Sequence, residues 1–316
     1  VVAIALDGVV RLEEANVPMS LDMPENQAIK YEWFGLQVST EIKYSDNCKA
    51  IAKLFRRLEQ KGLDKVLLLK GYGLSLYYPA AQHRDSGDID IFSFEGKSEE
   101  VDRALTRKSE EEPERSSSRE RHSHTSVCGV EVENHYCLCD IFSNPKRDSV
   151  VEAGLIEEAK ENSRRVGLDD AHLFLPSATF NAVFLIWHLA SHLTIERISL
   201  KQLCDWYCFL KVEGRNVDWE KVGLLLKKGR KKRLADTVNG LMIRYFGLDS
   251  SLIPAFGRRP EDEVRLMEFV FDDTPLKTKG PEAVLKYLRR SWNFRVAHES
   301  GWLGPLLEAA SRHYMK

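Results

Sequence analysis

The sequence lacks long hydrophobic runs, an excess of charge of one sign and a dense set of cysteines. Its longest apolar segments, near Leu67 and over residues 182–193, are too short or too interrupted to span a bilayer. The opening VVAIALDGVV also lacks the basic start and cleavage pattern of a signal peptide. Six cysteines among 316 residues do not make a disulfide scaffold, so we expect a protein of the reducing cytoplasm without a membrane partner.

The formal net charge of −2 excludes a bulk electrostatic attraction to nucleic acid or to an anionic membrane. One dense basic run, Lys227–Arg233, could contact tRNA or another polyanion. The run has no interleaved aromatic residues, and its patterning favours a solvated face. A nucleic-acid partner is therefore left open, although the net charge does not indicate one.

The length favours two domains, and the hydrophobic patterns change along the chain. Residues 1–44 predict an N-terminal extension that is partly helical. Residues 45–150 mix strand and helix patterns, which predicts an α/β domain with a mobile, polar insertion near 108–122. Residues 151–316 have helical period in nearly every strong segment, apart from a short stretch around 173–175. We expect an α+β protein in which a small mixed-sheet domain is followed by an all-helical domain.

The α/β domain should begin with a helix capped by Ser45 or Asp46 and ended by Gly62. The elements predicted after it are a strand over 66–69, a short helix over 73–78, a strand over 88–92, a helix over 98–107 and a strand over 127–136. In the second domain, Ser199 and Gln202 form a plausible capping box. Helices are predicted there over 177–193, 199–210, 219–228, 234–246, 261–271 and 283–294.

Acidic residues alternate along two of the predicted strands. Asp88 and Asp90 should point to one side of their strand, while Ile89 between them points into a core. Two like charges at such a short distance repel each other unless a cation lies between them. The spacing of the two carboxylates therefore suggests a divalent metal site. Glu133 on the following strand is the candidate third carboxylate, and Glu131, which shares its face, is the reserve candidate.

Basic residues and a glycine accompany these acids. Lys70-Gly71 comes between a buried strand and a short helix, where glycine lets the backbone approach a phosphate and the helix N-terminus favours an anion. Lys70 and Arg84 could neutralise triphosphate charge. A structural pairing of Arg84 with Asp85 or Asp88 is equally consistent with the sequence.

These residues together resemble the uncharacterised nucleotidyltransferase family of the DNA polymerase β-type superfamily. The resemblance rests on Lys70-Gly71, Tyr78-Pro79, Arg84 and the run Gly87–Asp90, followed by a segment in which Glu133, His135 and Tyr136 look like the family's acid-x-histidine-aromatic pattern. A helical segment over 198–206 is similar to a third, weaker motif. The similarity covers roughly residues 50–210. One position departs from the superfamily: its usual serine after the glycine is Tyr72 here.

The resemblance implies a polymerase β-like domain that moves a nucleoside monophosphate from an NTP, with ATP expected, to a hydroxyl acceptor. Asp88 and Asp90 would bind two Mg²⁺ ions, and Glu133 would complete the site and help to deprotonate the acceptor. Lys70, Gly71 and Arg84 would bind the triphosphate. The acceptor could be a small molecule, a protein side chain or an RNA end.

Three other interpretations remain open. A degenerate transferase domain could serve as a nucleotide-binding or partner-binding module, for example in a toxin–antitoxin pair; Tyr72 motivates this alternative. His188 and His192, one helical turn apart, could form a metal-hydrolase site with Asp205, although histidine on an apolar helix is more often a core residue. A zinc cluster could be drawn from the set Cys128, His135, Cys137 and Cys139, but strand alternation explains that set more simply.

Overall fold

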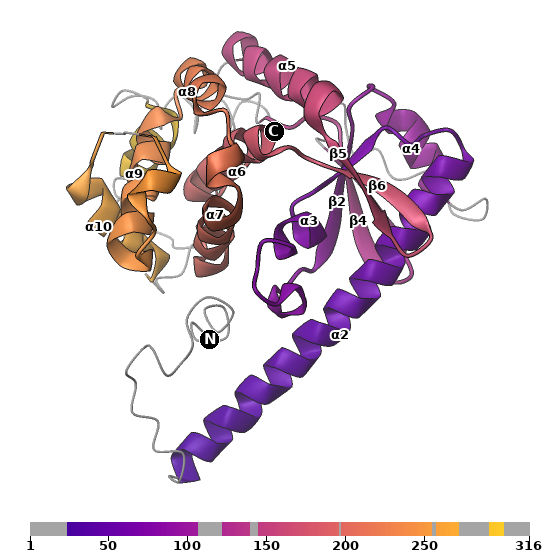
Figure 1. The fold of residues 1–316 in the computed structure, drawn as a ribbon, viewed down its shortest axis with the longest axis horizontal. Helices are drawn as coiled ribbons and strands as arrows, with labels where there is room; N and C mark the ends of the chain where they lie inside the picture. Colours follow the sequence, from indigo (N-terminus) through magenta and orange to yellow (C-terminus); the bar gives the residue numbers. More distant parts are fainter. Residues whose placement is uncertain are drawn as a thin grey trace, which may run out of the picture. The chain divides into compact units, whose positions relative to one another are not determined.

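The protein is described by a computed structural model over residues 24–106, 122–139, 145–195, 197–254, 257–271 and 291–299. The chain divides into two compact units (Figure 1). Unit 1 comprises residues 1–138 and 158–177, and unit 2 comprises residues 139–157 and 178–316. The insertion predicted near 108–122 lies outside the described residues, except for residue 122.

Unit 1 is built on a six-stranded mixed sheet with the strand order β3-β4-β2-β1-β6-β5. The strands are β1 (Val66–Leu69), β2 (Asp88–Ser93), β3 (His122–Val127), β4 (Val130–His135), β5 (Arg164–Leu168) and β6 (Ala171–Leu175). β2 pairs parallel with β4 and antiparallel with β1, and β1 pairs parallel with β6. The predicted mixed sheet with flanking helices is therefore confirmed.

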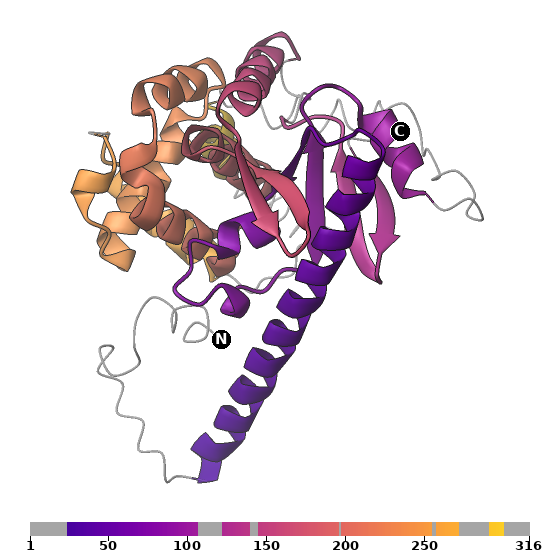
Figure 2. The ribbon, with the colours of Figure 1, turned by 45° about the vertical axis from the view of Figure 1, so that its right-hand side comes forward.

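The helices of unit 1 are α2 (Pro24–Gln60), α3 (Gly71–Ser75) and α4 (Ser98–Leu105), with a 3₁₀ turn, η1 (Ala81–His83). The C-terminal half of α2 packs with α4 against one face of the sheet (Figures 1 and 2). The core on this face contains Leu54, Phe55 and Leu58 of α2, and Ile89 and Ile91 of β2. Because side chains alternate along a strand, Asp88 and Asp90 lie on the opposite face of the sheet.

The predicted helix cap at Ser45 or Asp46 is wrong, because both residues lie inside α2. No proline and no glycine follow Gly35 within the helix, so nothing in the sequence interrupts it before its end. The predicted end is correct. Gly62 adopts a left-handed conformation with φ of 68°, and its N–H donates to the Glu59 carbonyl at 3.0 Å.

The segment predicted as one strand over 127–136 contains the turn and the second strand of a hairpin, which begins at His122. β3 and β4 are joined at Cys128 and Gly129, which have φ angles of 55° and 82°. Two consecutive residues with positive φ are typical of a tight hairpin turn that matches the twist of the strands. The prediction missed β3 because its sequence, HSHTSV, has no apolar alternation, as is common on a sheet edge.

The sheet also continues into the segment predicted as helical. Residues 164–175 form β5 and β6, which pair antiparallel and attach to β1 through β6. The predicted stretch around 173–175 is part of β6. The division into domains at residue 150 stays a prediction.

The described residues of unit 2 form helices and 3₁₀ turns. The elements are most of α5 (Pro145–Asn162), then α6 (Ala178–Ile195), α7 (Leu200–Glu213), η2 (Gly214–Asn216), α8 (Trp219–Lys228), α9 (Lys232–Phe246), η3 (Ser250–Leu252), α10 (Pro260–Val270) and a helical segment over 291–298. The predicted capping box is confirmed: the Ser199 hydroxyl accepts from the Gln202 N–H, and the Gln202 side chain accepts from the Ser199 N–H. Phe180, Trp206 and Phe209 are fully buried in its core.

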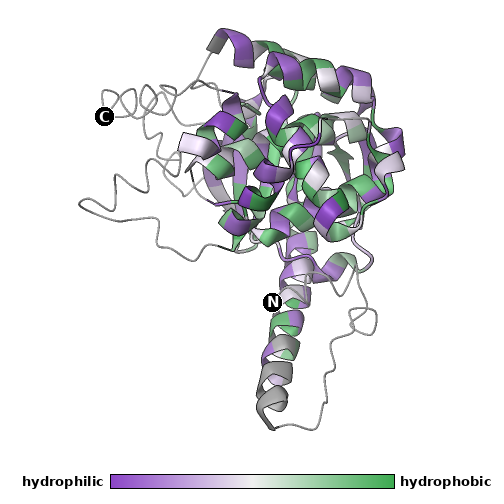
Figure 3. Ribbon diagram, turned by 90° about the vertical axis from the view of Figure 1, so that its left-hand side faces the viewer, coloured by the Kyte–Doolittle hydropathy of each residue, from purple (hydrophilic) through white to green (hydrophobic). Residues whose placement is uncertain are grey.

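Hydrophobic and hydrophilic residues are mixed along the helices (Figure 3). Among the described residues, no helix is both long enough and apolar enough to cross a membrane.

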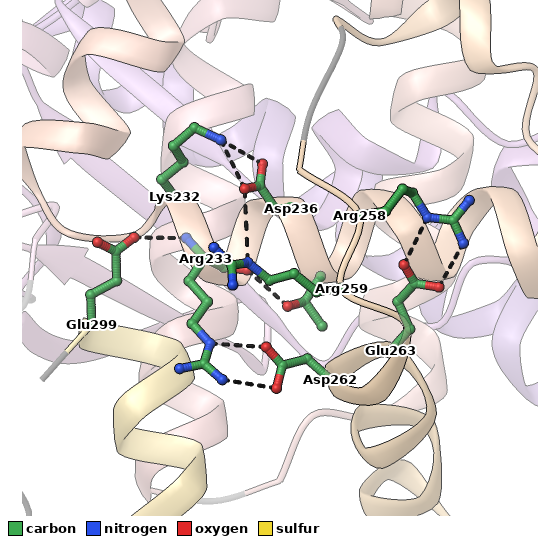
Figure 4. Close-up of polar contacts among 9 residues, drawn as sticks. Lys232, Arg233, Asp236, Arg258, Arg259, Asp262, Glu263 and Glu299 are labelled. Atoms are coloured by element: carbon green, nitrogen blue, oxygen red, sulfur yellow. Dashed lines mark hydrogen bonds and ion pairs between the residues drawn. The ribbon is translucent and has the colours of Figure 1, made fainter. Parts of the chain in front are cut away.

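The basic run Lys227–Arg233 is only partly a solvated face. Lys227 and Lys228 are exposed, as predicted. Lys231 is buried, with its ammonium 2.8 Å from His298 Nδ1. Lys232 and Arg233 pair with acids of unit 2 (Figure 4): the former with Asp236 at 2.8 Å, the latter with Asp262 at 2.9 Å. These pairings leave fewer basic groups for a polyanion than the sequence suggests.

Candidate active site

The predicted acids meet on the sheet face opposite the α2–α4 core. In the parallel pairing of β2 with β4, Asp88 lies opposite Glu131, and Asp90 lies opposite Glu133. His135, two residues beyond Glu133, shares their face because strand side chains alternate. Lys70 reaches the same place from the end of β1. Two neighbouring strands and the end of a third therefore gather these charged side chains at one site.

Asp90 is the best-defined member of the site. Its carboxylate is 2% exposed, and Oδ1 lies 2.7 Å from Lys70 Nζ and 2.7 Å from His135 Nε2. Burial alone would raise the pKa of Asp90, but the Lys70 ammonium and the bond from His135 outweigh it and hold this pKa well below its usual range. Asp90 therefore stays ionised at any physiological pH.

Glu133 has the opposite electrostatic character. Its Oε2 lies 3.7 Å from His135 Nε2. Burial raises the pKa of Glu133, and the neighbouring Asp90 charge raises it further, with a smaller contribution from Asp88. Two carboxylates in one site thus have pKa values shifted in opposite directions, a pattern that is typical of functional sites.

Three side chains of the site could hold a cation together. One ligand atom each from Asp90, Glu133 and His135 lie within 4.8 Å of one another. Asp88 is not part of this group; it is partly exposed at the start of β2, on the same face as Asp90. The structure thus brings together two of the three predicted acids and adds His135, which the family resemblance had included without a role.

Lys70 and Gly71 adopt backbone conformations that most residues avoid. Lys70 has φ of 46° and ψ of −136°, and Gly71 has φ of 36°. A non-glycine residue in such a region costs about 1–3 kcal/mol and persists where the surrounding structure over-determines it, often at functional sites. The Lys70 carbonyl accepts the Leu74 N–H at 3.1 Å, so this strained link opens α3 directly beside the acids.

We expect Gly71→Ala to lower the free energy of unfolding by about 1–3 kcal/mol. The new Cβ would lie 3.1 Å from Ser86 Oγ, in a backbone conformation that alanine rarely adopts. Urea denaturation measures the effect. Gly87→Ala is the matched control, because Gly87 has no positive φ and a Cβ added to it would meet no heavy atom within 4 Å. Equal stability of the two variants would contradict this interpretation of Gly71.

Arg84 is buried at the end of η1, where its Nη1 donates to the Asp85 carbonyl at 3.5 Å. The Asp85 carboxylate pairs with Lys43 at 3.3 Å. A role for Arg84 at the triphosphate stays a prediction.

Tyr72, at the position where the resemblance leads us to expect a serine, packs toward α2. Its ring stacks on Tyr44 with 6.1 Å between centroids and contacts the core of unit 1. Burial raises the pKa of Tyr72 and raises the pKa of Tyr44 to about 12, so both phenols stay protonated. The substitution therefore has a packing role in this chain. A serine hydroxyl, Ser86 Oγ, nevertheless lies close to Gly71.

A buried hydrogen-bond network behind the site was not predicted. Asn134 lies between Glu133 and His135 and points to the other face, where its amide donates to Asp102 Oδ1 at 2.7 Å and to the Ser98 carbonyl at 2.9 Å. Asp102 also accepts from the Tyr136 hydroxyl at 2.6 Å and from Ser123. The network ties β4 to α4. Its one sequence signal is a polar residue, Asn134, at a core-facing position of an alternating strand.

The other proposed metal sites gain no support. Among the described residues, only two groups bring three possible ligand atoms together: the one at Asp90, and a second formed by His122, His124 and Glu133. Neither contains a cysteine, and neither contains His188, which packs edge to face on His192 with ring centroids 4.4 Å apart.

Comparison with known proteins gives one match. A family model described as an uncharacterised nucleotidyltransferase matches residues 18–244, which include every acid and basic residue of the site. No curated protein matches the chain, and no solved structure does.

Proposed function

Because the chain belongs to the uncharacterised nucleotidyltransferase family, we propose that it transfers a nucleoside monophosphate from an NTP, with ATP expected, to a hydroxyl acceptor. The observation that carries the proposal is the pairing of Asp90 with Glu133 across β2 and β4, with Lys70 beside them. The register places an alternating acid pair beside a third acid on the next strand, and carboxylates gathered in this way could hold the two metal ions of an in-line transfer.

The residues fit a divalent cation by their chemistry. Carboxylate oxygens suit Mg²⁺, and ligand atoms of Asp90 and Glu133 already lie within 4.8 Å of each other. We propose that Asp88, Asp90 and Glu133 hold two Mg²⁺ ions. When bound, such ions neutralise phosphate charge and lower the pKa of an attacking hydroxyl.

The chain's own residues supply binding and proton transfer. Lys70, held at Asp90, places a positive charge beside the α3 N-terminus, where the Gly71 backbone can approach a phosphate. Arg84 is the second candidate cation for the triphosphate. Glu133, whose pKa is raised, is suited to accept the proton of the acceptor hydroxyl. His135 lies between the two acids, with its Nε2 atom 2.7 Å from Asp90 and 3.7 Å from Glu133.

Glu133→Gln and Glu131→Gln separate the two candidates for the third carboxylate. We expect Glu133→Gln to lower the transfer rate by about 100-fold or more, because general-base catalysis typically contributes 10²–10⁴-fold. Glu131 is exposed and bonds His124 at 2.8 Å, so Glu131→Gln should keep a rate close to that of the wild type. The measurement is transfer of α-labelled ATP to acceptor pools with Mg²⁺. If only Glu131→Gln lowered the transfer rate, Glu131 and not Glu133 would be the third carboxylate.

The same assay tests the alternative of a nucleotide-binding module without turnover. Tyr72 motivates this alternative, because the family resemblance leads us to expect a phosphate-contacting serine at its position. Such a module would bind Mg²⁺–ATP in calorimetry and release no pyrophosphate with any acceptor pool. Pyrophosphate release that depends on an acceptor would exclude it.

A further inference from the structure

Two histidines of the edge strand β3 lie next to the proposed catalytic acids but are not part of them. His122 and His124 are two residues apart and point to the same side of β3. In the antiparallel pairing of β3 with β4, His124 lies directly opposite Glu133, and His122 lies opposite His135. The ring centroids of His122 and His124 are 4.7 Å apart.

These histidines form a group of possible ligands with Glu133. One ligand atom each from His122, His124 and Glu133 lie within 4.8 Å of one another. His124 Nδ1 is 3.8 Å from Glu133 Oε1 and 2.8 Å from Glu131 Oε1. Two imidazoles and one carboxylate are a ligand set of catalytic zinc sites, whereas Mg²⁺ prefers oxygen ligands alone.

We propose that His122, His124 and Glu133 form a binding site for a borderline divalent transition metal, Zn²⁺ above all. The site differs from the proposed Mg²⁺ site in its two histidines, and the two sites have Glu133 in common. His124 is exposed and His122 partly so, which leaves a coordination position open to solvent. Because Glu131 lies 2.8 Å from His124 Nδ1, His124 would bind the metal through Nε2. Glu131 would then accept from the other ring nitrogen and orient the imidazole, the role that carboxylates commonly have at metal-bound histidines.

A plain ion pair between His124 and Glu131 would account for the 2.8 Å contact. It would not account for the presence of His122 and Glu133 beside His124. An exposed pair contributes little to stability and needs no further partners. Here His122 and Glu133 converge on the same point, from the strand of His124 and from the strand beside it.

The site shares Glu133 with the proposed catalytic residues. If the protein has the proposed function, a metal bound at the histidines should therefore affect nucleotidyl transfer. A transition metal bound to His122 and His124 holds the Glu133 carboxylate, which is then less available to the Mg²⁺ site and to the acceptor proton. Zn²⁺ should therefore inhibit Mg²⁺-dependent transfer, and His124→Ala should relieve this inhibition.

Metal binding is tested without nucleotide, using the untagged, metal-stripped full-length protein titrated with Co²⁺ and with Zn²⁺. We expect Co²⁺ absorption typical of nitrogen and oxygen ligands, and at least about a 10-fold loss of Zn²⁺ affinity in His122→Ala and in His124→Ala. His172→Ala is the matched control, because His172 is an exposed strand histidine that lies 3.8 Å from a different acid, Glu59. Circular dichroism verifies that each variant is folded.

The results of these titrations test the Zn²⁺ site independently of nucleotidyl transfer. Unchanged Zn²⁺ affinity in both His122→Ala and His124→Ala overturns the proposal, as does thiolate-to-cobalt charge transfer, which would place the metal on a cysteine. Loss of affinity in these variants, with His172→Ala unchanged, supports the site even if the protein transfers no nucleotide. If transfer occurs and bound Zn²⁺ does not inhibit it, the shared use of Glu133 is overturned while the site stands.

Discussion

Asp90→Asn is expected to lower nucleotidyl transfer by about 1000-fold or more, because it removes the central carboxylate of the proposed metal site. Outer-shell changes at metal sites already cost about 10–100-fold, and Asp90 would be a direct ligand. Its neutral replacement leaves the Lys70 ammonium and His135 without their anionic partner. Transfer of α-labelled ATP, together with calorimetric titration of Mg²⁺–ATP, measures the loss.

The matched control is Asp85→Asn, an exposed acid of the same region whose carboxylate pairs with Lys43. This variant should keep both Mg²⁺–ATP binding and transfer. If Asp90→Asn also kept them, the proposed mechanism would be lost.

The lowered pKa of Asp90 also predicts how the stability of the protein depends on pH. Because this pKa is lower in the folded protein than in the unfolded chain, ionised Asp90 stabilises the fold above the unfolded value of about 3.9. That contribution is lost as the pH falls through the folded pKa. The difference in free energy of unfolding between wild type and Asp90→Asn should therefore shrink as the pH falls below about 4. Urea denaturation at several pH values measures it.

The sequence predicted those elements that have a buried face and a clear boundary. β1 and β2 were expected because apolar residues run through one and alternate in the other, and the capping box at Ser199 was expected because its residue types are specific. β3 and β5 were missed because both are edge strands with partly polar sequences, which carry little alternation. Their place in the sheet depends on pairing partners that are distant in the chain.

In the candidate site too, single residues could not be assigned without knowing how the strands pair. Alternation places Glu131 and Glu133 on one face, and it gives no means of choosing between them. The strand register supplies the choice that we propose, since Glu133 lies opposite Asp90 and Glu131 lies opposite Asp88. The histidines of β3 were not predicted as a group because they reach Glu133 only through the hairpin pairing.

Asp102→Ala is expected to lower the free energy of unfolding by about 3 kcal/mol or more, although Asp102 lies on the face opposite the proposed catalytic acids. Asp102 is nearly buried, and its two oxygens accept from Asn134, Tyr136 and Ser123. A hydrogen bond to a charged group contributes about 1.5–3 kcal/mol, and a buried donor left without a partner costs about 1–3 kcal/mol. Chemical denaturation measures the loss. Asp46→Ala is the control, because Asp46 is exposed and pairs with Lys49 in a surface contact one helical turn away.

The same substitution should slow nucleotidyl transfer even at temperatures where the variant is fully folded. Asn134 lies between Glu133 and His135 on β4, so its bond to Asp102 fixes the strand that presents both side chains to Asp90. A displacement of about 1 Å in a catalytic arrangement can cost about 100-fold in rate. We therefore expect the transfer rate of Asp102→Ala to fall while Asp46→Ala keeps the wild-type rate. A folded Asp102→Ala protein with both wild-type stability and wild-type rate would show that α4 does not position β4.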